Sequence, residues 1–191
     1  MSIRIAIFAS GTGSNARKIM EHFQDHPAIR VALVVSNNAD AGVLEIARNF
    51  GIKSLVINKK QLNDPGLLES MLQDHGVEFI VLAGFLLKIP DHLITAYPQK
   101  IVNIHPALLP AFGGKGMYGM HVHEAVIKSG VKESGISIHY VDNQYDHGET
   151  IFQARCTVSP DETPESLSKK IQRLEHEHYA SVLERLLQNP R

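Results

Sequence analysis

Short apolar runs alternate with amphipathic stretches along the first 105 residues of the chain. The β-branched run at residues 3–9 predicts a buried strand, and helical spacing follows it at residues 15–23. The same alternation then repeats, with strands expected at residues 30–37, 53–57, 78–84 and 100–105 and helices at 41–51, 64–76 and 90–98. Strands that alternate with helices in this way predict a parallel sheet with helices on both faces.

The alternation changes after residue 105. A long loop is expected at residues 106–119 and a helix at 120–130, followed by two strands at 134–142 and 149–158 that form an antiparallel pair. A closing amphipathic helix is expected at 163–187, with Thr163 or Ser166 as its cap. We therefore predict one domain over residues 1–191. Its fold is an open, mostly parallel, Rossmann-like α/β sheet with helices on both faces and an antiparallel C-terminal strand pair, and it should bind ligands at strand carboxyl ends.

Composition limits the classes of function. The chain has 191 residues, 43% hydrophobic and 20% charged, with a net charge of −1, so no general nucleic-acid-binding surface is expected. No window approaches the ~18 apolar residues of a membrane span, and the N-terminus does not read as a signal peptide. The single cysteine, Cys156, suits a reducing compartment and reads as a quiet, partly buried thiol. A cytoplasmic location is expected.

A glycine loop, "GTGSNA", follows the first strand at residues 11–16. It fits a loose dinucleotide pattern, but the second strand ends "VVSNN", with neither an acid for a ribose nor an arginine for a ribose phosphate. Backbone N–H groups that converge at a helix N-terminus favour an anion, and Ser14 and Asn15 add side-chain donors. The loop therefore favours a monophosphate, and a simple tight turn capped by Ser14 remains the alternative.

The stretch "IVNIHPALLP", residues 101–110, places two polar side chains at a strand end. Asn103 and His105 are two residues apart, so they project from the same face, and Pro106 keeps His105 extended. Asp146 follows later, on a turn that Gly148 should hold. If these groups share a crevice, Asn103 and a protonated His105 can stabilise an oxyanion while Asp146 orients His105.

This set of groups suits acyl-group transfer, and no Ser or Cys lies in a nucleophile-elbow context. Attack by a substrate's own amine therefore fits better than a covalent intermediate. From spacing alone, a buried histidine hydrogen-bonded within the core is almost as good an interpretation.

Five segments resemble a known protein family in their order and spacing. "FASGTGSN", "VLAGFLLKIP", "IVNIHPALLPAF", "GISIHYV" and "DHGETIFQ" resemble the folate-dependent formyltransferases, and the resemblance covers nearly the whole chain. It implies the formyltransferase fold, with Asn103, His105 and Asp146 as the catalytic residues. It also implies formyl transfer from 10-formyltetrahydrofolate to the amine of glycinamide ribonucleotide, a step of purine biosynthesis.

The same resemblance implies the binding residues. Gly13, Ser14 and Asn15 would bind the phosphate of glycinamide ribonucleotide, and Glu175 would meet its glycinamide end. The partners implied are these small molecules alone, without nucleic acid or membrane, in a monomer or a homodimer. The residues expected around the folate are Leu86, Leu87, Lys88, Ile89, Asn103, Asp142, Asn143, Gln144, Tyr145 and Asp146.

The chain departs from the family pattern in two segments. Residues 58–66 lack the arginine that members often carry near the folate tail, and Lys59 or Lys60 is the candidate substitute. The segment "GGKGMYGMHVHEA" is longer than its usual counterpart, which leaves the contacts of the loop at 113–120 open.

Three other functions compete with formyl transfer to a small amine. A formyltetrahydrofolate deformylase would use the same trio with water, but that relative is expected to carry an N-terminal regulatory domain. A tRNA-modifying formyltransferase is expected to need a further C-terminal domain and a basic face. The third alternative is a non-catalytic protein that binds a phosphate ligand.

Histidines also occur in two close pairs, in "MHVHEA" and "EHEHYA". Residues two apart on a helix lie ~200° around its axis, so neither pair shares a face. No metal site is therefore expected, and these histidines should face solvent.

Overall fold

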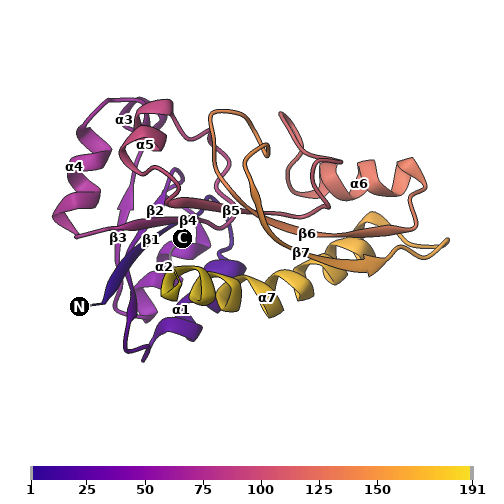
Figure 1. Cartoon of the computed structure of the whole chain (residues 1–191), viewed down its shortest axis with the longest axis horizontal. Helices are drawn as coiled ribbons and strands as arrows, with labels where there is room; N and C mark the ends of the chain where they lie inside the picture. Colours follow the sequence, from indigo (N-terminus) through magenta and orange to yellow (C-terminus); the bar gives the residue numbers. More distant parts are fainter. Residues whose placement is uncertain (1, 190–191) are drawn as a thin grey trace.

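The computed structural model describes residues 2–189, and its strands form one seven-stranded sheet (Figure 1). The strands are β1 (Ile3–Phe8), β2 (Ile29–Ser36), β3 (Lys53–Val56), β4 (Phe79–Leu82), β5 (Ile101–His105), β6 (Glu133–Tyr140) and β7 (Thr150–Thr157). Their order across the sheet is β3-β2-β1-β4-β5-β6-β7. The neighbours from β3 to β5 pair in parallel, whereas β6 pairs antiparallel with both β5 and β7. The predicted mixed sheet is therefore confirmed.

Helices connect the strands and close the chain. They are α1 (Ser14–Phe23), α2 (Gly42–Asn49), α3 (Lys59–Leu62), α4 (Leu67–Asp74), α5 (Asp91–Ala96), α6 (Met120–Ser129) and α7 (Pro164–Gln188). The helices differ from the sequence prediction mainly between residues 58 and 67. The short helix α3 was not predicted, and it forms because Asn58 and Gln61 make a reciprocal capping box. Helix α4 begins after Pro65, at Leu67, rather than at residue 64. Of the two caps predicted for α7, Thr163 is the N-cap, and Ser166 is the N3 residue of its capping box.

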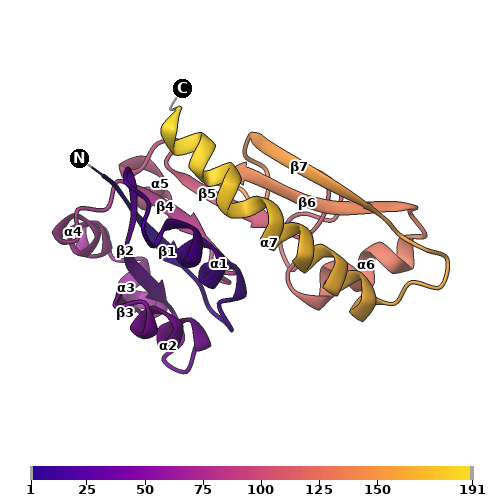
Figure 2. The same ribbon diagram turned by 90° about the horizontal axis from the view of Figure 1, so that it is seen from below.

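Each face of the sheet has its own hydrophobic core. One core includes side chains from α1, α2 and α7, and the other includes side chains from α3, α4 and α5. Figure 2 shows α7 running across its face of the sheet beside α1. The hydroxyl of Tyr179 on α7 is buried and donates towards the carbonyl oxygens of Leu82, at 2.8 Å, and Val102, at 3.3 Å. This helix is therefore tied to the two strands at the centre of the sheet.

The register of β5 with its neighbours brings distant polar residues together. Asn103 lies opposite Leu82 of β4 on one side and His139 of β6 on the other. His105, at the end of β5, lies opposite Ser137. Because directly opposed residues on neighbouring strands share a face, Asn103 and His139 can interact.

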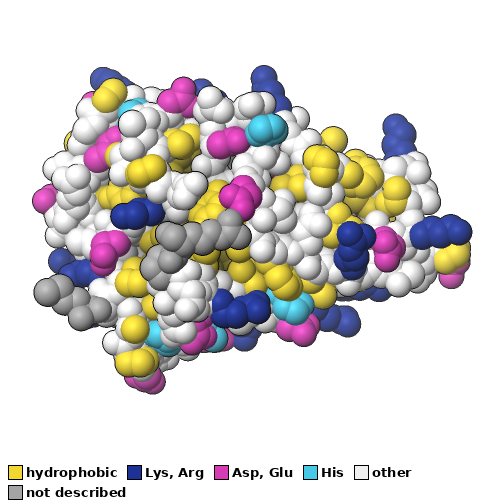
Figure 3. All heavy atoms as spheres, viewed as in Figure 1, with side chains coloured by type: hydrophobic (Ala, Val, Ile, Leu, Met, Phe, Trp, Pro, Cys, Tyr) yellow, Lys and Arg dark blue, Asp and Glu magenta, His cyan; other side chains and the backbone are white. Residues whose placement is uncertain are grey.

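The surface carries charges of both signs. On the face in Figure 3, basic and acidic side chains are interspersed, with apolar side chains between them. None of the helices within residues 2–189 is both long enough and apolar enough to cross a membrane. Cys156 on β7 is partly buried, and burial raises the pKa of its thiol, which agrees with the predicted quiet cysteine.

A carboxylate and two histidines fasten α1 to α7. Glu184 on α7 accepts from Nε2 of His22 at 2.6 Å and contacts Nε2 of His26 at 3.3 Å. Nδ1 of His26 accepts the backbone N–H groups of Ala28 and Ile29, so Nε2 is the nitrogen that carries the proton towards Glu184. The hydrogen bond from His22, with a further contribution from His26, lowers the pKa of Glu184.

We expect this contact to make stability depend on pH. A carboxylate whose pKa is lower in the folded than in the unfolded state stabilises the protein above its unfolded value, and this contribution disappears as the pH falls through the folded value. Thermal melting of wild type and Glu184→Gln should therefore differ at pH 6, with the wild type more stable. The difference should shrink below the ordinary glutamate value of 4.5. A constant difference from pH 6 to pH 3 would contradict this assignment.

Candidate active site

A cavity of about 360 Å³ opens at the carboxyl ends of β1, β4 and β5. Its walls come from residues 11–15, residues 82–89, the end of β5, the loop at 114–119, the turn at 141–146 and one face of α7. The site thus forms where the crevice of an open α/β sheet is expected to bind ligands. Asn103, His105 and Asp146 all line this cavity, so the structure brings the three predicted catalytic residues together.

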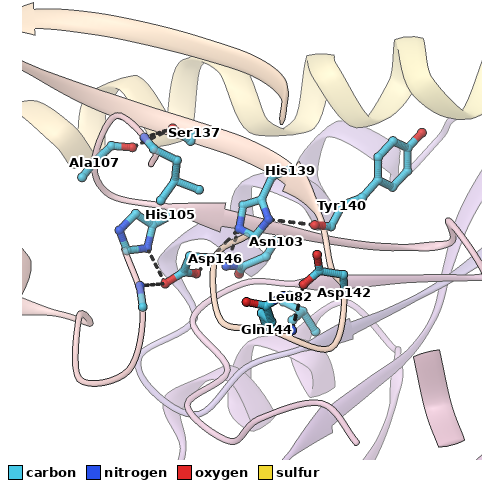
Figure 4. Close-up of polar contacts among 12 residues, drawn as sticks. Leu82, Asn103, His105, Ala107, Ser137, His139, Tyr140, Asp142, Gln144 and Asp146 are labelled. Atoms are coloured by element: carbon cyan, nitrogen blue, oxygen red, sulfur yellow. Dashed lines mark hydrogen bonds and ion pairs between the residues drawn. The ribbon is translucent and has the colours of Figure 1, made fainter. Parts of the chain in front are cut away.

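Asn103 is oriented by a histidine on the neighbouring strand. Nδ2 of Asn103 lies 3.2 Å from Nε2 of His139, and Nδ1 of His139 lies 2.8 Å from the carbonyl oxygen of Tyr140 (Figure 4). Because that carbonyl requires a proton on Nδ1, Nε2 is left as the acceptor for the Asn103 amide. Burial lowers the pKa of His139, which favours this neutral form. One N–H of Asn103 is thereby fixed, and the second is left for a ligand.

His105 is almost fully buried, with 3% of its surface exposed. Its Nε2 donates to the carbonyl oxygen of Phe112 at 2.7 Å, and its Nδ1 lies 3.5 Å from Oδ2 of Asp146. Both ring nitrogens therefore face oxygen acceptors, which is the arrangement that a doubly protonated imidazolium satisfies. The contact with Asp146 is long for a hydrogen bond, so a substrate oxygen can share Nδ1–H with that carboxylate.

Two residues around His105 have unusual backbones. Phe112 and Asp146 are two of the non-glycine residues with positive φ, at 56° and 52°. In this conformation the Phe112 carbonyl accepts the hydrogen bond from His105. The Asp146 carboxylate contacts His105 and also accepts the N–H of Gly114 at 3.0 Å. Such strained conformations persist where the surrounding structure fixes them, commonly at functional sites. Gly148 closes the turn after Asp146, and a Cβ there would lie 1.9 Å from the carbonyl oxygen of Tyr140.

The glycine loop forms the opposite end of the cavity. Gly13 adopts the left-handed conformation, φ 78°, immediately before α1, so the first N–H groups of that helix point towards the cavity. The Nδ2 group of Asn15 donates to Glu175 at 3.0 Å, and burial raises the pKa of that carboxyl. Gln172, one turn before Glu175 on α7, lies with its Nε2 3.4 Å from the Ser14 hydroxyl. Sequence reasoning missed Gln172, although its spacing of three from Glu175 is a helical-face signal.

Most of the predicted folate residues line the cavity wall that is formed by residues 82–89 and the turn at 141–146. Leu86, Leu87, Lys88 and Ile89 all line it, and Lys88 is the only lysine or arginine in its wall within residues 2–189. The turn contributes Asp142, Gln144, Tyr145 and Asp146, whereas Asn143 is exposed and does not line the cavity. Lys59 and Lys60 are exposed on α3 and lie outside the lining.

Ser10 holds the loop at residues 83–89 against the glycine loop. The hydroxyl of Ser10 donates to Oδ1 of Asn37 at 2.5 Å and accepts the N–H of Leu86 at 2.9 Å. The N–H of Ser10 itself donates to the carbonyl of Gly84 at 3.0 Å. Ser10 therefore links the ends of β1 and β2 to the loop after β4.

The helix histidines do not all face solvent as predicted, and His176 and His178 on α7 are half-buried. His121 faces solvent, with 64% of its side chain exposed, but His123 is buried at 5% and lines the cavity. The two differ because α6 turns one face towards the protein, and residues two apart lie on different faces of the helix.

The sheet has helices on both faces, and its polar cavity opens at the carboxyl ends of the strands. These two features define a Rossmann-like α/β protein. This chain belongs to the formyl transferase family, whose model matches residues 3–183.

Individual relatives agree with that assignment. A chloroplastic phosphoribosylglycinamide formyltransferase of Arabidopsis thaliana is 45% identical over 94% of this chain, which spans 64% of that relative's length. The phosphoribosylglycinamide formyltransferase of Bacillus subtilis is 38% identical, and the match covers 96% of this chain and 94% of that protein. The crystal structure of the phosphoribosylglycinamide formyltransferase from Anaplasma phagocytophilum is similar, with a TM-score of 0.89 and 35% identity over 98% of this chain and 88% of that one.

Proposed function

We propose that the protein transfers a formyl group from 10-formyltetrahydrofolate to the amine of glycinamide ribonucleotide. The observation that carries this proposal is the shared cavity, which joins the Asn103–His105–Asp146 cluster to a phosphate-type loop. The names of the Arabidopsis and Bacillus relatives describe the same activity.

The glycine-loop end of the cavity suits a phosphorylated amine. Backbone N–H groups at the start of α1, with Ser14 and Gln172, supply uncharged donors for a phosphate. Glu175 lies next to this loop through its bond with Asn15, so it is the acidic group within reach of the amine end. A substrate with a phosphate and an amine therefore spans the region from residues 13–15 towards Asn103.

The folate-side wall suits a flat heteroaromatic ring. Leu87 and Ile89 provide apolar contact, and the adjoining turn at 141–146 provides backbone and carboxylate partners. A mixture of apolar surface with a few polar groups is typical of small-molecule sites. In this proposal the folate enters from the side opposite the ribonucleotide.

The chemistry follows from the placement of the three polar residues. The amine nitrogen attacks the formyl carbon and forms the new C–N bond, while the carbonyl oxygen becomes an oxyanion. Nδ1–H of His105 and the free N–H of Asn103 stabilise this oxygen, and Asp146 orients the His105 ring. The bond from the formyl carbon to N10 of the folate then breaks, and the proton that the amine loses is transferred to N10 as tetrahydrofolate leaves. The cavity holds both reactants together, which contributes the proximity effect.

The direct test is an assay of the purified protein with glycinamide ribonucleotide and 10-formyltetrahydrofolate. We expect tetrahydrofolate to form only when the amine substrate is present, together with formylated ribonucleotide. Folate turnover without the amine would instead support a hydrolase of the deformylase type. Binding of the ribonucleotide without any turnover would support the non-catalytic alternative.

Replacing Ser14 and Asn15 together with alanine should weaken ribonucleotide binding by about 10-fold, because two donors to a charged phosphate are lost. Calorimetric titration with glycinamide ribonucleotide measures this effect. The double variant Ser54→Ala, Asn63→Ala changes the same residue types at exposed positions outside the cavity and serves as the control. Equal affinity in the two double variants would count against the phosphate assignment.

Location and assembly stay predictions. The Arabidopsis relative is named chloroplastic, so members of the family occur in more than one compartment. We propose the cytoplasmic location and the monomeric or homodimeric state expected from the sequence.

A further inference from the structure

His123 is a buried imidazole in the cavity that the mechanism above does not use. It lies in the first turns of α6, directly after the glycine-rich loop at 113–119, and only 5% of its surface is exposed. Its ring forms part of the wall of the same cavity that contains His105.

One nitrogen of this ring has no partner. Nδ1 of His123 is buried and makes no hydrogen bond to any described residue. Burial lowers the pKa of His123, and the nearby charge of His105 lowers it further, so the ring is neutral at neutral pH. Buried polar atoms in native proteins are nearly always paired, so an unpaired nitrogen of a ring that lines a binding cavity indicates a partner that arrives with the ligand or its water.

The position of α6 indicates which ligand His123 meets. Helix α6 packs against α7, which carries Gln172 and Glu175 into the same cavity. Val126, three residues after His123, belongs to the core that α1 and α7 share. Ile89, from the loop at residues 83–89, belongs to the core on the other face of the sheet. His123 therefore reaches the cavity from the side of α7.

We propose that His123 is a further binding residue for the amine substrate, and that its neutral ring hydrogen-bonds the uncharged sugar–amide part of that molecule. This inference rests on the proposed function. The phosphate end has its own donors at residues 13–15, and the formyl oxygen is assigned to Asn103 and His105. The part of the substrate between these two ends is uncharged, and a neutral imidazole can donate to or accept from its hydroxyl and amide groups.

Two substitutions separate a hydrogen bond from simple packing. His123→Phe keeps a planar ring of similar size but removes both nitrogens. His123→Asn places a polar atom close to the position of Nδ1. We expect His123→Phe to raise the KM for glycinamide ribonucleotide about 10-fold, with a change of less than about 2-fold in the KM for 10-formyltetrahydrofolate. His123→Asn should recover most of the ribonucleotide affinity. The exposed His121→Phe is the matched control and should leave both KM values unchanged.

Calorimetric titration of each variant with glycinamide ribonucleotide gives affinity independently of turnover. A phenylalanine variant that binds as tightly as wild type would overturn the inference and leave the proposed function intact. A wild-type protein that does not bind the ribonucleotide would overturn both. Equal losses for both substrates, without recovery in His123→Asn, would assign His123 a structural role and also overturn the inference. If His123→Phe does not melt cooperatively, His123→Leu takes its place in the same comparison.

Discussion

Replacing His105 with alanine should lower the turnover of glycinamide ribonucleotide by about 100-fold or more while ribonucleotide affinity changes little. The reason is positional. The carbonyl of Phe112 and Asp146 hold the imidazole from both sides, so Nδ1–H has a fixed position from which it can donate to the oxygen that becomes negative. The hydrogen bond from Nδ1–H of His105 therefore stabilises the transition state more than the bound substrate. Its loss appears in kcat rather than in binding.

Steady-state kinetics and calorimetric titration of the same preparation check this result. His121→Ala is the control, because His121 is an exposed histidine on α6 outside the cavity lining. An unchanged kcat in His105→Ala would remove His105 from the chemistry. A loss confined to ribonucleotide affinity would make it a binding residue instead.

Replacing Gly13 with alanine should abolish most ribonucleotide binding, with an expected loss of about 10-fold or more. Gly13 has φ 78°, which costs an L-residue about 1–2 kcal/mol. An added Cβ would also lie 2.7 Å from Cβ and 2.8 Å from Cα of Val43 in α2. Relief of this clash must move either α2 or the glycine loop, and moving the loop displaces the N–H groups proposed to bind the phosphate.

Gly66→Ala is the matched control for Gly13→Ala. Gly66 is also left-handed, φ 88°, but a Cβ there meets no atom within 4 Å, and Gly66 does not line the cavity. We expect it to lower the melting temperature without changing ribonucleotide affinity, whereas Gly13→Ala should change both. Retention of wild-type affinity in Gly13→Ala would show that the loop does not bind the phosphate.

Local pattern was sufficient to predict the sheet and most of the helices. The β-branched runs of the central strands have no competing interpretation, and the confirmed cap at Thr163 follows from side-chain chemistry alone. The exceptions are also local. The hydrophobic pattern did not show the capping box of α3. It also extended α4 back across Pro65, although a helix boundary often falls at a proline.

The site was less accessible to sequence reasoning because its remaining contacts depend on register and backbone geometry. Spacing shows that Asn103 and His105 share a face, but only the pairing of β5 with β6 brings His139 to the Asn103 amide. The carbonyl of Phe112 has no side-chain signature at all. His123 was expected in solvent because helical periodicity gives the angle between faces without showing which face the protein covers.

The connection between α6 and β6 has a practical consequence. Residues 130–132 are exposed, and they separate the chain into a piece with Asn103 and His105 and a piece with His139 and Asp146. The two pieces would be held together by the β5–β6 ladder. They would also be joined by the hydrogen bonds that Tyr179 on α7 donates to β4 and β5. If the protein has the proposed activity, a chain cut at these residues would be a split enzyme, in which formyl transfer reports that the two fragments have reassembled.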